Sequence, residues 1–155
     1  MNVEKAGTGD IGALTGLRLE YLREDLGRLG EEEECILRRD LPGYFRSHLN
    51  RDLFAYVIRE EGAIVSCAFL LVVEKPMSPA FISGKTGTVL NVYSCPSRRG
   101  KGYAGAIIKA LLRDAREKGL SVIELKSTEA GRRLYLSAGF SEDDSGYYRM
   151  KWTNR

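Results

Sequence analysis

The sequence predicts an α/β (α+β) domain built on a mixed β-sheet with helices on both faces. The middle of the chain holds neighbouring apolar segments separated by short turns, a pattern typical of β-hairpins. The C-terminal half instead alternates short apolar segments with amphipathic segments of helical period, as in crossover connections between parallel strands. The resulting element order, β-α-α-β-β-β-α-β-α-β(β), therefore predicts a helix layer on each side of the sheet.

Length and composition favour a single soluble domain over residues 1–155. The chain is 43% hydrophobic and 29% charged, and its formal net charge of +3 is too small to indicate a nucleic-acid partner. No apolar run approaches the ~20 residues that cross a membrane, and the N-terminus lacks a signal-like apolar region. The three cysteines form neither a disulfide framework nor a Cys-x-x-Cys metal pair. We therefore expect a cytoplasmic protein without a metal, a membrane or a nucleic-acid partner.

The N-terminal third predicts one edge strand and two helices. The strand is expected over residues 2–6, and the first helix over about 8–26, where possible capping residues precede an apolar period and glycines follow it. A second helix opens at the acidic run 31–34, because carboxylates stabilise the positive N-terminal end of a helix. Pro42 predicts a restart of this helix, since proline fits the first helical position.

Several strands are predicted after residue 53, apart from the stretch 87–105, which is described below. Residues 54–59 and 63–73 predict a hairpin, and the longer, nearly continuous apolar run should lie centrally in the sheet. Residues 75–85 contain two prolines and a glycine and predict a loop. A further strand is expected over 121–126, and Phe140 with 147–152 predicts a final strand pair around an acidic, glycine-containing turn.

The stretch 87–105 organises the chain. A β-branched and aromatic strand ends at Pro96, a basic glycine loop follows, and a helix begins near Gly102 and closes at Gly119. The first N–H groups of a helix lack internal partners and carry partial positive charge. Glycines let a ligand approach them, and arginine and lysine add full charges. The loop is therefore either a phosphate or pyrophosphate site or a solvated basic turn.

A dinucleotide site is one version of the phosphate interpretation. Gly100, Gly102 and Gly105 fit the G-x-G-x-x-G pattern, and Glu124 lies about 20 residues further on, where a ribose-binding acid is expected. Two observations argue against it. Glu124 sits inside an apolar run rather than clearly at a strand end. The loop also begins near residue 98, which leaves too little sequence for the usual succession of βα units.

Two sequence blocks resemble the GNAT family of acetyl-CoA-dependent N-acetyltransferases. Residues 99–104, Arg-Gly-Lys-Gly-Tyr-Ala, match the R/Q-x-x-G-x-G/A signature of that family. Residues 134–140, Leu-Tyr-Leu-Ser-Ala-Gly-Phe, are similar to its L-Y-x-x-x-G-F pattern. The resemblance covers about 87–140 and implies a mixed, mostly antiparallel sheet of six to seven strands. It also implies acetyl-CoA as co-substrate, direct acetyl transfer and a possible homodimer.

The resemblance further implies where coenzyme A would lie. The pantetheine arm would pair with the strand end near Ser94, where this strand parts from the strand over 121–126, and one backbone N–H would hold the thioester oxygen. The pyrophosphate would rest on the loop. The cofactor-binding residues implied are Tyr93, Ser94, Cys95, Arg98, Arg99, Gly100, Lys101, Gly102, Tyr103, Ala104, Thr128 and Gly131.

Two residues are the candidate catalytic groups. Tyr135 matches the tyrosine that protonates the coenzyme A thiolate in many family members, and a phenol suits this transfer because the two groups have similar basicity. Its alternative role is packing against the sheet. The strand before the loop carries no acid where some members have a glutamate base, so Glu20 acting through water is the candidate base, with bulk solvent as the alternative.

The sequence does not identify the acceptor of the acetyl group. A primary amine of a small molecule is the first expectation, and Glu20 with Glu24 favours a cationic one. The alternatives are a protein lysine or N-terminus, and a non-catalytic acyl-CoA-binding sensor on the same fold. Retained coenzyme A binding without acetyl transfer would distinguish the sensor.

Overall fold

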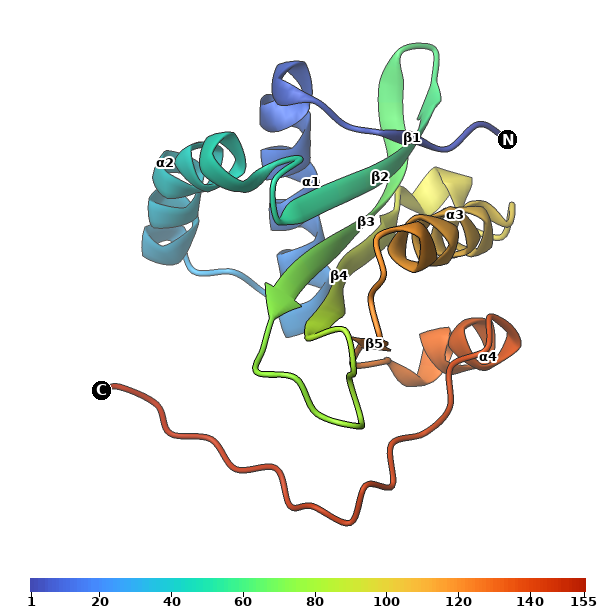
Figure 1. The fold of residues 1–155 in the computed structure, drawn as a ribbon. Coiled ribbons are helices and arrows are strands. Elements are labelled where there is room, and N and C mark those ends of the chain that lie inside the picture. The colour runs from blue at the N-terminus through green and yellow to red at the C-terminus, as the bar shows by residue number, and fades with distance from the viewer.

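The computed structural model describes residues 1–155 and contains one five-stranded sheet between two helix layers (Figure 1). The strands are β1 (Glu4–Lys5), β2 (Leu53–Glu60), β3 (Ala63–Glu74), β4 (Lys85–Ser94) and β5 (Val122–Glu124). Their order in the sheet follows the chain, β1-β2-β3-β4-β5. Pairs up to β3–β4 are antiparallel and β4–β5 is parallel. The predicted mixed, mostly antiparallel sheet is therefore confirmed.

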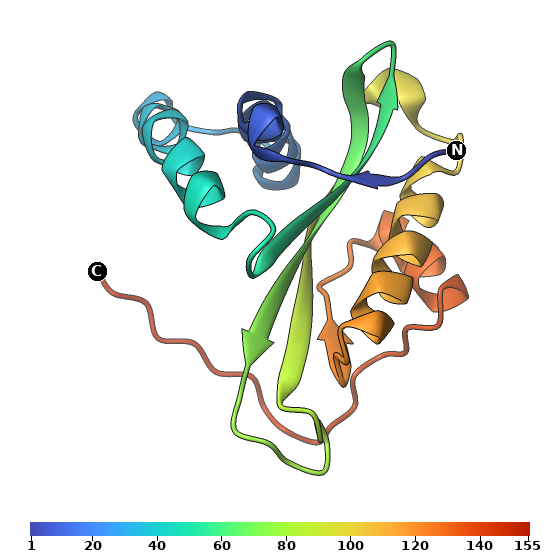
Figure 2. The same cartoon turned by 45° about the horizontal axis from the view of Figure 1, so that its top comes forward.

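Two helices cover each face of this sheet, as Figure 2 shows from a second direction. On one side lie α1 (Ile11–Leu26) and α2 (Glu31–His48), and on the other lie α3 (Tyr103–Glu117) and α4 (Glu129–Ser137). Short 3-10 turns, η1 (Thr8–Asp10) and η2 (Pro96–Arg98), precede α1 and the basic loop. None of the helices contains an apolar stretch of the length that spans a bilayer. No group of three or more potential metal ligands is present.

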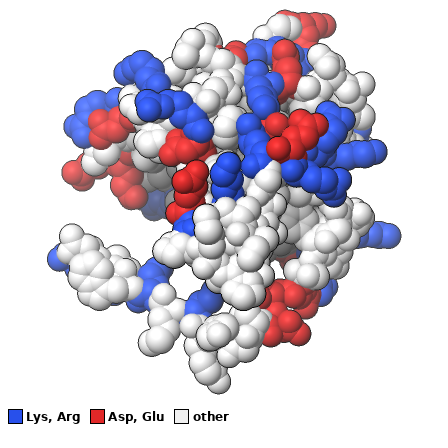
Figure 3. Space-filling view, in the orientation of Figure 1, with Lys and Arg blue, Asp and Glu red and all other residues white.

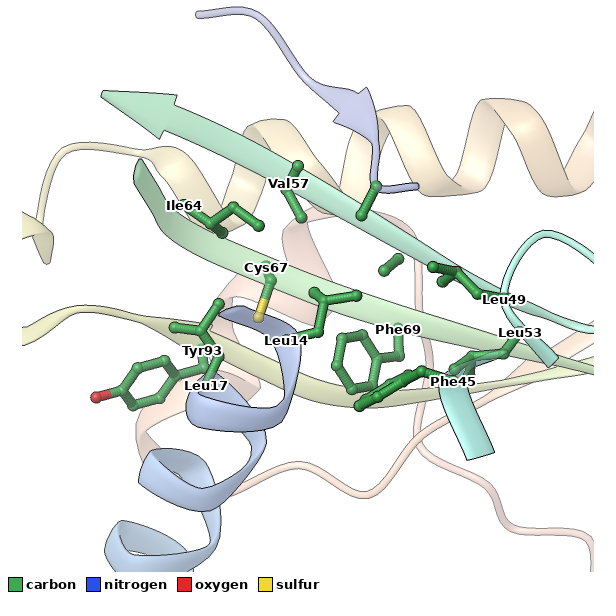
Figure 4. Close-up of a cluster of buried hydrophobic side chains, with 12 residues drawn as sticks. Leu14, Leu17, Phe45, Leu49, Leu53, Val57, Ile64, Cys67, Phe69 and Tyr93 are labelled. Atoms are coloured by element: carbon green, nitrogen blue, oxygen red, sulfur yellow. The ribbon is translucent and has the colours of Figure 1, made fainter. Parts of the chain in front are cut away.

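The two sheet faces carry separate cores because successive strand residues point to opposite sides. In β2, Leu53, Ala55 and Val57 face α1 and α2, whereas Phe54, Tyr56 and Ile58 face α3. Figure 4 shows the first cluster, in which Leu14 and Leu17 of α1 and Phe45 of α2 close over the sheet. The second cluster receives Ile107, Ile108, Leu111 and Ala115 from α3. Both helix layers are thus anchored by buried apolar side chains.

One buried polar contact ties β2 to α3 and yields the first prediction. The phenol of Tyr56 is 2% exposed and donates to Asp114, which also pairs with Lys5 at 2.9 Å. Tyr56→Phe should lower the free energy of unfolding by about 1–2 kcal/mol, because the partly buried carboxylate loses a charge-assisted hydrogen bond. Urea unfolding at pH 7 measures this loss, and an unchanged midpoint would contradict it.

The same contact predicts a pH dependence. Burial opposes ionisation of Asp114, but hydrogen bonds from Tyr56 and Lys5 outweigh it and lower its pKa. A depressed folded-state pKa gives stability that is present above the unfolded pKa, about 3.9 for aspartate, and is lost as pH falls through the folded value. The difference in the free energy of unfolding between wild type and Tyr56→Phe should therefore become smaller in acid, as Asp114 is protonated.

Two sequence predictions were wrong. The final strand pair does not form, because residues 141–155 make no backbone–backbone hydrogen bond and run as an extended tail (Figure 1). The sheet accordingly has five strands rather than six or seven. Pro42 also does not restart a helix but lies inside the continuous α2. Proline has no N–H to donate to the carbonyl of residue 38 in the preceding turn. Residues 38–40 are exposed, so water can donate to that carbonyl instead.

Candidate functional site

The sheet opens where β4 extends beyond β5. The parallel pairing joins only Thr86, Gly87 and Thr88 to β5, so the rest of β4 has no strand on that side. The N–H of Cys95 donates to Val65 of β3, while the carbonyl of Ser94 accepts from the Arg99 side chain. Backbone groups of alternate residues point to opposite edges. Ser94 therefore faces the open edge, whereas the Cys95 N–H is engaged by β3.

A buried bulge sits in the same part of β4. Asn91 has φ of 56° and is 2% exposed, and the β3–β4 register shifts between Cys67 and Phe69, opposite it. Its side-chain oxygen accepts from Arg18 at 3.2 Å, and its amide nitrogen lies 3.6 Å from the Cys67 sulfur. These contacts compensate for the strained backbone, and the bulge bends β4 at the point where the sheet opens.

The opening forms a pocket of about 530 Å³ between β4, the end of β5 and α4. Tyr21 and Asp25 reach it from α1, Thr128 and Tyr135 from α4 and the segment before it, and Arg149 from the tail. The remaining lining residues are Thr88, Val89, Leu90, Asn91, Val92, Glu124, Leu125, Lys126 and Ser127. Such a volume fits one small ligand or the reactive end of a larger one.

The basic glycine loop presents the uncapped N-terminus of α3. Gly100 and Gly102 have φ of 77° and 79°, values that favour glycine, and Gly102 is the N-cap residue. No side chain caps the helix, so its first N–H groups stay free for an external acceptor. A Cβ at Gly102 would lie 3.8 Å from the methyl group of Met1, and a Cβ at Gly100 would have no atom within 4 Å. The loop is thus open to an approaching anion.

The two arginines of the loop are already engaged by carboxylates. Arg98 pairs with Glu60 at the end of β2, and Tyr103 donates to the same carboxylate. Arg99 pairs with Glu24 of α1 at 2.6 Å and lies 5.5 Å from the centre of the Tyr93 ring. These contacts fix the loop from both sides of the sheet. Lys101 has no ion pair, so it is the loop cation without an acidic partner.

Tyr135 of α4 lies at the pocket with its ring edge against Phe140, 5.9 Å between centroids. Burial and then the neighbouring Tyr21 raise the pKa of its phenol. A Cβ on Gly131 would approach the Tyr135 ring to 3.1 Å, so this glycine makes room for the ring. Thr128 caps α4, because its hydroxyl accepts from the N–H of Gly131 at 3.2 Å. Gly131 and Thr128 therefore position the Tyr135 helix.

Glu20 lies on α1 near the end of β4 and does not line the pocket. Burial and then Glu20 raise the pKa of Tyr93 to about 12. The same two causes raise the pKa of the Cys95 thiol, which disfavours a thiolate nucleophile there. His48, the only histidine, pairs with Asp52 and stacks on Tyr44 of α2.

Comparison with known proteins places the chain in a family. The model of the Acetyltransferase (GNAT) family matches residues 18–140, which is most of the chain. The chain belongs to the GNAT acetyltransferase family. None of the curated proteins compared with it matches.

Solved structures agree with this GNAT assignment. A predicted acetyltransferase from Clostridium acetobutylicum, solved with acetyl-CoA, is 26% identical with a TM-score of 0.83 over 97% of this chain and 95% of that one. A GCN5-related N-acetyltransferase from Ralstonia eutropha is 25% identical with a TM-score of 0.77, over 99% and 97%. A ribosomal-protein-alanine N-acetyltransferase from Brucella melitensis shares the fold at 22% identity and a TM-score of 0.68, over 98% and 100%.

In this GNAT fold most of the predicted residues form two groups, while Glu20 and residues 93–95 at the end of β4 lie outside the pocket. The loop residues surround the α3 N-terminus, and Tyr135 with Thr128 lies on the pocket at the open edge of β4. Glu20 lies beside Tyr93. Sequence reasoning assigned no role to Asp25 or Glu60, and it did not predict the bulge at Asn91. Asparagine inside an apolar strand was an available signal for the bulge, since it tolerates positive φ better than other non-glycine residues.

Proposed function

We propose that this GNAT domain is an N-acetyltransferase that moves the acetyl group of acetyl-CoA directly to the primary amine of a small molecule. One observation carries the proposal. The open edge of β4 and the half-buried phenol of Tyr135 border the same pocket, and the uncapped N-terminus of α3 follows β4 directly along the chain. These features support a coenzyme A thioester that lies along β4, with the N-terminus of α3 as its anion site and Tyr135 as its proton donor.

Binding would use the open edge and the loop together. Backbone groups of β4 that face away from β3, those of Ser94 and, by alternation, Val92, would pair with the amides of the pantetheine arm. The free N–H groups at the start of α3 would bind the pyrophosphate, with Lys101 as the added charge. Arg98 and Arg99 would act indirectly by holding the loop through Glu60 and Glu24.

Three groups of the chain would act on the thioester during acetyl transfer: a hydrogen-bond donor, an acid and a base. The amine nitrogen attacks the thioester carbonyl, and a β4 backbone N–H stabilises the developing oxyanion. When the C–S bond breaks, Tyr135 donates its proton to the departing thiolate. A phenol is already protonated at neutral pH, and burial raises its pKa further. Glu20, through water, would accept the proton that the amine loses.

The size of the pocket favours a small acceptor. The pocket volume of about 530 Å³ is in the range that encloses one small ligand, and a protein side chain would need an open groove. Asp25 lines the pocket from α1, and no side chain forms an ion pair with it. The lining carries two acidic residues, Asp25 and Glu124, and two basic ones, Lys126 and Arg149, so its formal charge is balanced.

The role of Lys101 gives a graded prediction. Lys101→Ala should weaken acetyl-CoA binding about two- to fivefold, because an exposed charge beside a helix N-terminus contributes modestly. The effect should shrink as salt is raised. The control is Lys109→Ala, which removes the same charge further along α3. Equal loss in both variants, measured by calorimetry, would show a net-charge effect instead of a local contact.

The proposal as a whole is tested by thiol release. Purified protein with acetyl-CoA should release free coenzyme A only when a small primary amine is present, and mass spectrometry should find that amine acetylated. Acetylation confined to a peptide would favour the protein-acceptor alternative. Acetyl-CoA binding with no transfer to either class of amine would favour the sensor and overturn the enzymatic proposal.

A further inference from the structure

Arg18 of α1 is a partly buried cation without a carboxylate partner. Every other arginine that forms no ion pair is exposed. Figure 3 shows the usual arrangement, in which lysine and arginine side chains lie on the surface, many of them beside acidic ones. A charge that is withdrawn from water costs free energy unless it is paired. Arg18 therefore favours a negative partner that the chain itself does not supply.

The side chain of Arg18 uses little of its capacity for hydrogen bonds. Its Nη1 donates to Oδ1 of Asn91 in β4 at 3.2 Å, and its Cζ lies 5.7 Å from the centre of the Tyr21 ring. It makes no other side-chain hydrogen bond, so Nε and Nη2 are free. These two nitrogens can donate in parallel, which is the geometry that matches the two oxygens of a carboxylate.

Arg18 lies beside the pocket at the open edge of β4. Both of its contacts, Asn91 and Tyr21, line that pocket, and Asp25 lines it as well. Arg18, Tyr21 and Asp25 follow one another at i, i+3 and i+7, so they share one face of α1. Three residues of helix rise by about 4.5 Å. Arg18 thus extends the α1 wall of the pocket by nearly one turn beyond Tyr21.

We propose that the acceptor amine also carries a carboxylate, and that Arg18 binds this carboxylate and thereby selects the acceptor. The inference rests on the proposed function, because it concerns the second substrate of the same site. An amine with one carboxylate is a zwitterion without net charge, which suits a pocket whose acidic and basic lining residues balance. Arg18 acts on binding alone, since its guanidinium holds the end of the acceptor that does not react.

A purely structural role for Arg18 makes a different prediction. The hydrogen bond to Asn91 helps to hold the bulge of β4, and loss of the bulge would disturb the pocket for every ligand. Matched ligands separate the two roles. Glycine, β-alanine, γ-aminobutyrate and phenylalanine each differ from their own carboxamide in charge but hardly in size, and together they vary the distance between amine and carboxylate.

Calorimetric titration of the protein with these pairs, with and without coenzyme A, requires no acetyl transfer. We expect at least one of the acids to bind about 10- to 100-fold more tightly than its amide, because it alone accepts charge-assisted hydrogen bonds. Arg18→Gln should weaken that acid to the level of its amide and leave the amide unchanged. Arg18→Lys should keep part of the preference, since it retains the charge but not the parallel donors.

The control is Arg46→Gln, which removes an exposed and unpaired cation from α2 and should leave the preference intact. Kinetics add a second measurement. In acetyl transfer to the preferred acid, Arg18→Gln should raise KM about 10- to 100-fold and leave kcat nearly unchanged, because the lost contact is made equally in the ground state and the transition state.

Equal binding of every acid and its amide to the wild-type protein would overturn the inference. A preference that persists in Arg18→Gln would overturn it too, and so would a loss of affinity for acids and amides alike, which would assign Arg18 to the bulge. Binding of an acid that depends on Arg18, without transfer of an acetyl group, would support the carboxylate site and overturn only the enzymatic proposal. The two failures are therefore distinguishable.

Discussion

Gly102→Asp is expected to weaken acetyl-CoA binding roughly 100-fold more than Gly102→Asn does. Both substitutions place a side chain of the same size at φ of 79°, a conformation that asparagine and aspartate adopt more readily than other residues. Space is available, because a Cβ at this position would meet only the Met1 methyl at 3.8 Å. The two variants therefore differ only in charge.

The expected effect of that charge is large. Either side chain at the N-cap position of α3 can accept hydrogen bonds from the free N–H groups, so that competition is shared by the two variants, whereas only the aspartate repels the phosphates. Repulsion between the aspartate and the pyrophosphate across a few ångströms of protein surface corresponds to about 3 kcal/mol or roughly 100-fold in affinity. Strain from the new side chain is shared by the asparagine control and cancels in the comparison.

Calorimetric titration with acetyl-CoA, coenzyme A and NAD⁺ measures this effect, with circular dichroism to verify that both variants fold. Equal affinity in the two variants would remove the α3 N-terminus from the binding site. Binding of NAD⁺ in preference to acetyl-CoA would revive the dinucleotide interpretation of Gly100, Gly102 and Gly105.

The organising loop was predictable because its determinants are local. The helix over Tyr103–Glu117 follows from an apolar period that begins after Gly102 and ends at Gly119. The hairpin of β2 and β3 likewise follows from alternation around a short turn. Local sequence decides such elements because backbone propensity, side-chain period and capping agree. The family motifs then indicated which of these local elements carry function.

What the sequence did not predict depends on contacts between distant segments. Glu60 holds Arg98 and Tyr103, about forty positions further on, and no local pattern marks that partnership. Two arginines that looked available to phosphates are therefore neutralised by carboxylates from β2 and α1. The strand that was predicted in the tail is absent for a different reason. The alternation in the tail predicts a strand, but a strand forms only where a neighbour supplies hydrogen bonds, and residues 141–155 find none in their own chain.

Tyr135→Phe should lower kcat about 10²- to 10³-fold and leave acetyl-CoA affinity almost unchanged. General acid catalysis by one positioned side chain contributes about 10²- to 10⁴-fold, and the phenyl ring preserves the packing against Phe140. The control is Tyr44→Phe, which removes a phenol from the exposed surface of α2. A fall in affinity with unchanged kcat would instead assign Tyr135 to packing and binding.

The pH profile separates proton donation from every other role of this ring. Burial, and then Tyr21, raise the pKa of Tyr135, so its acid form persists beyond the usual tyrosine value of about 10. Because the donor acts in its protonated form, kcat of the wild-type protein should fall only as pH rises through that elevated value. Tyr135→Phe, which has no proton to lose, should lack this alkaline limb. A limb that persists in the variant would belong to another group, and Tyr135 would then not be the acid.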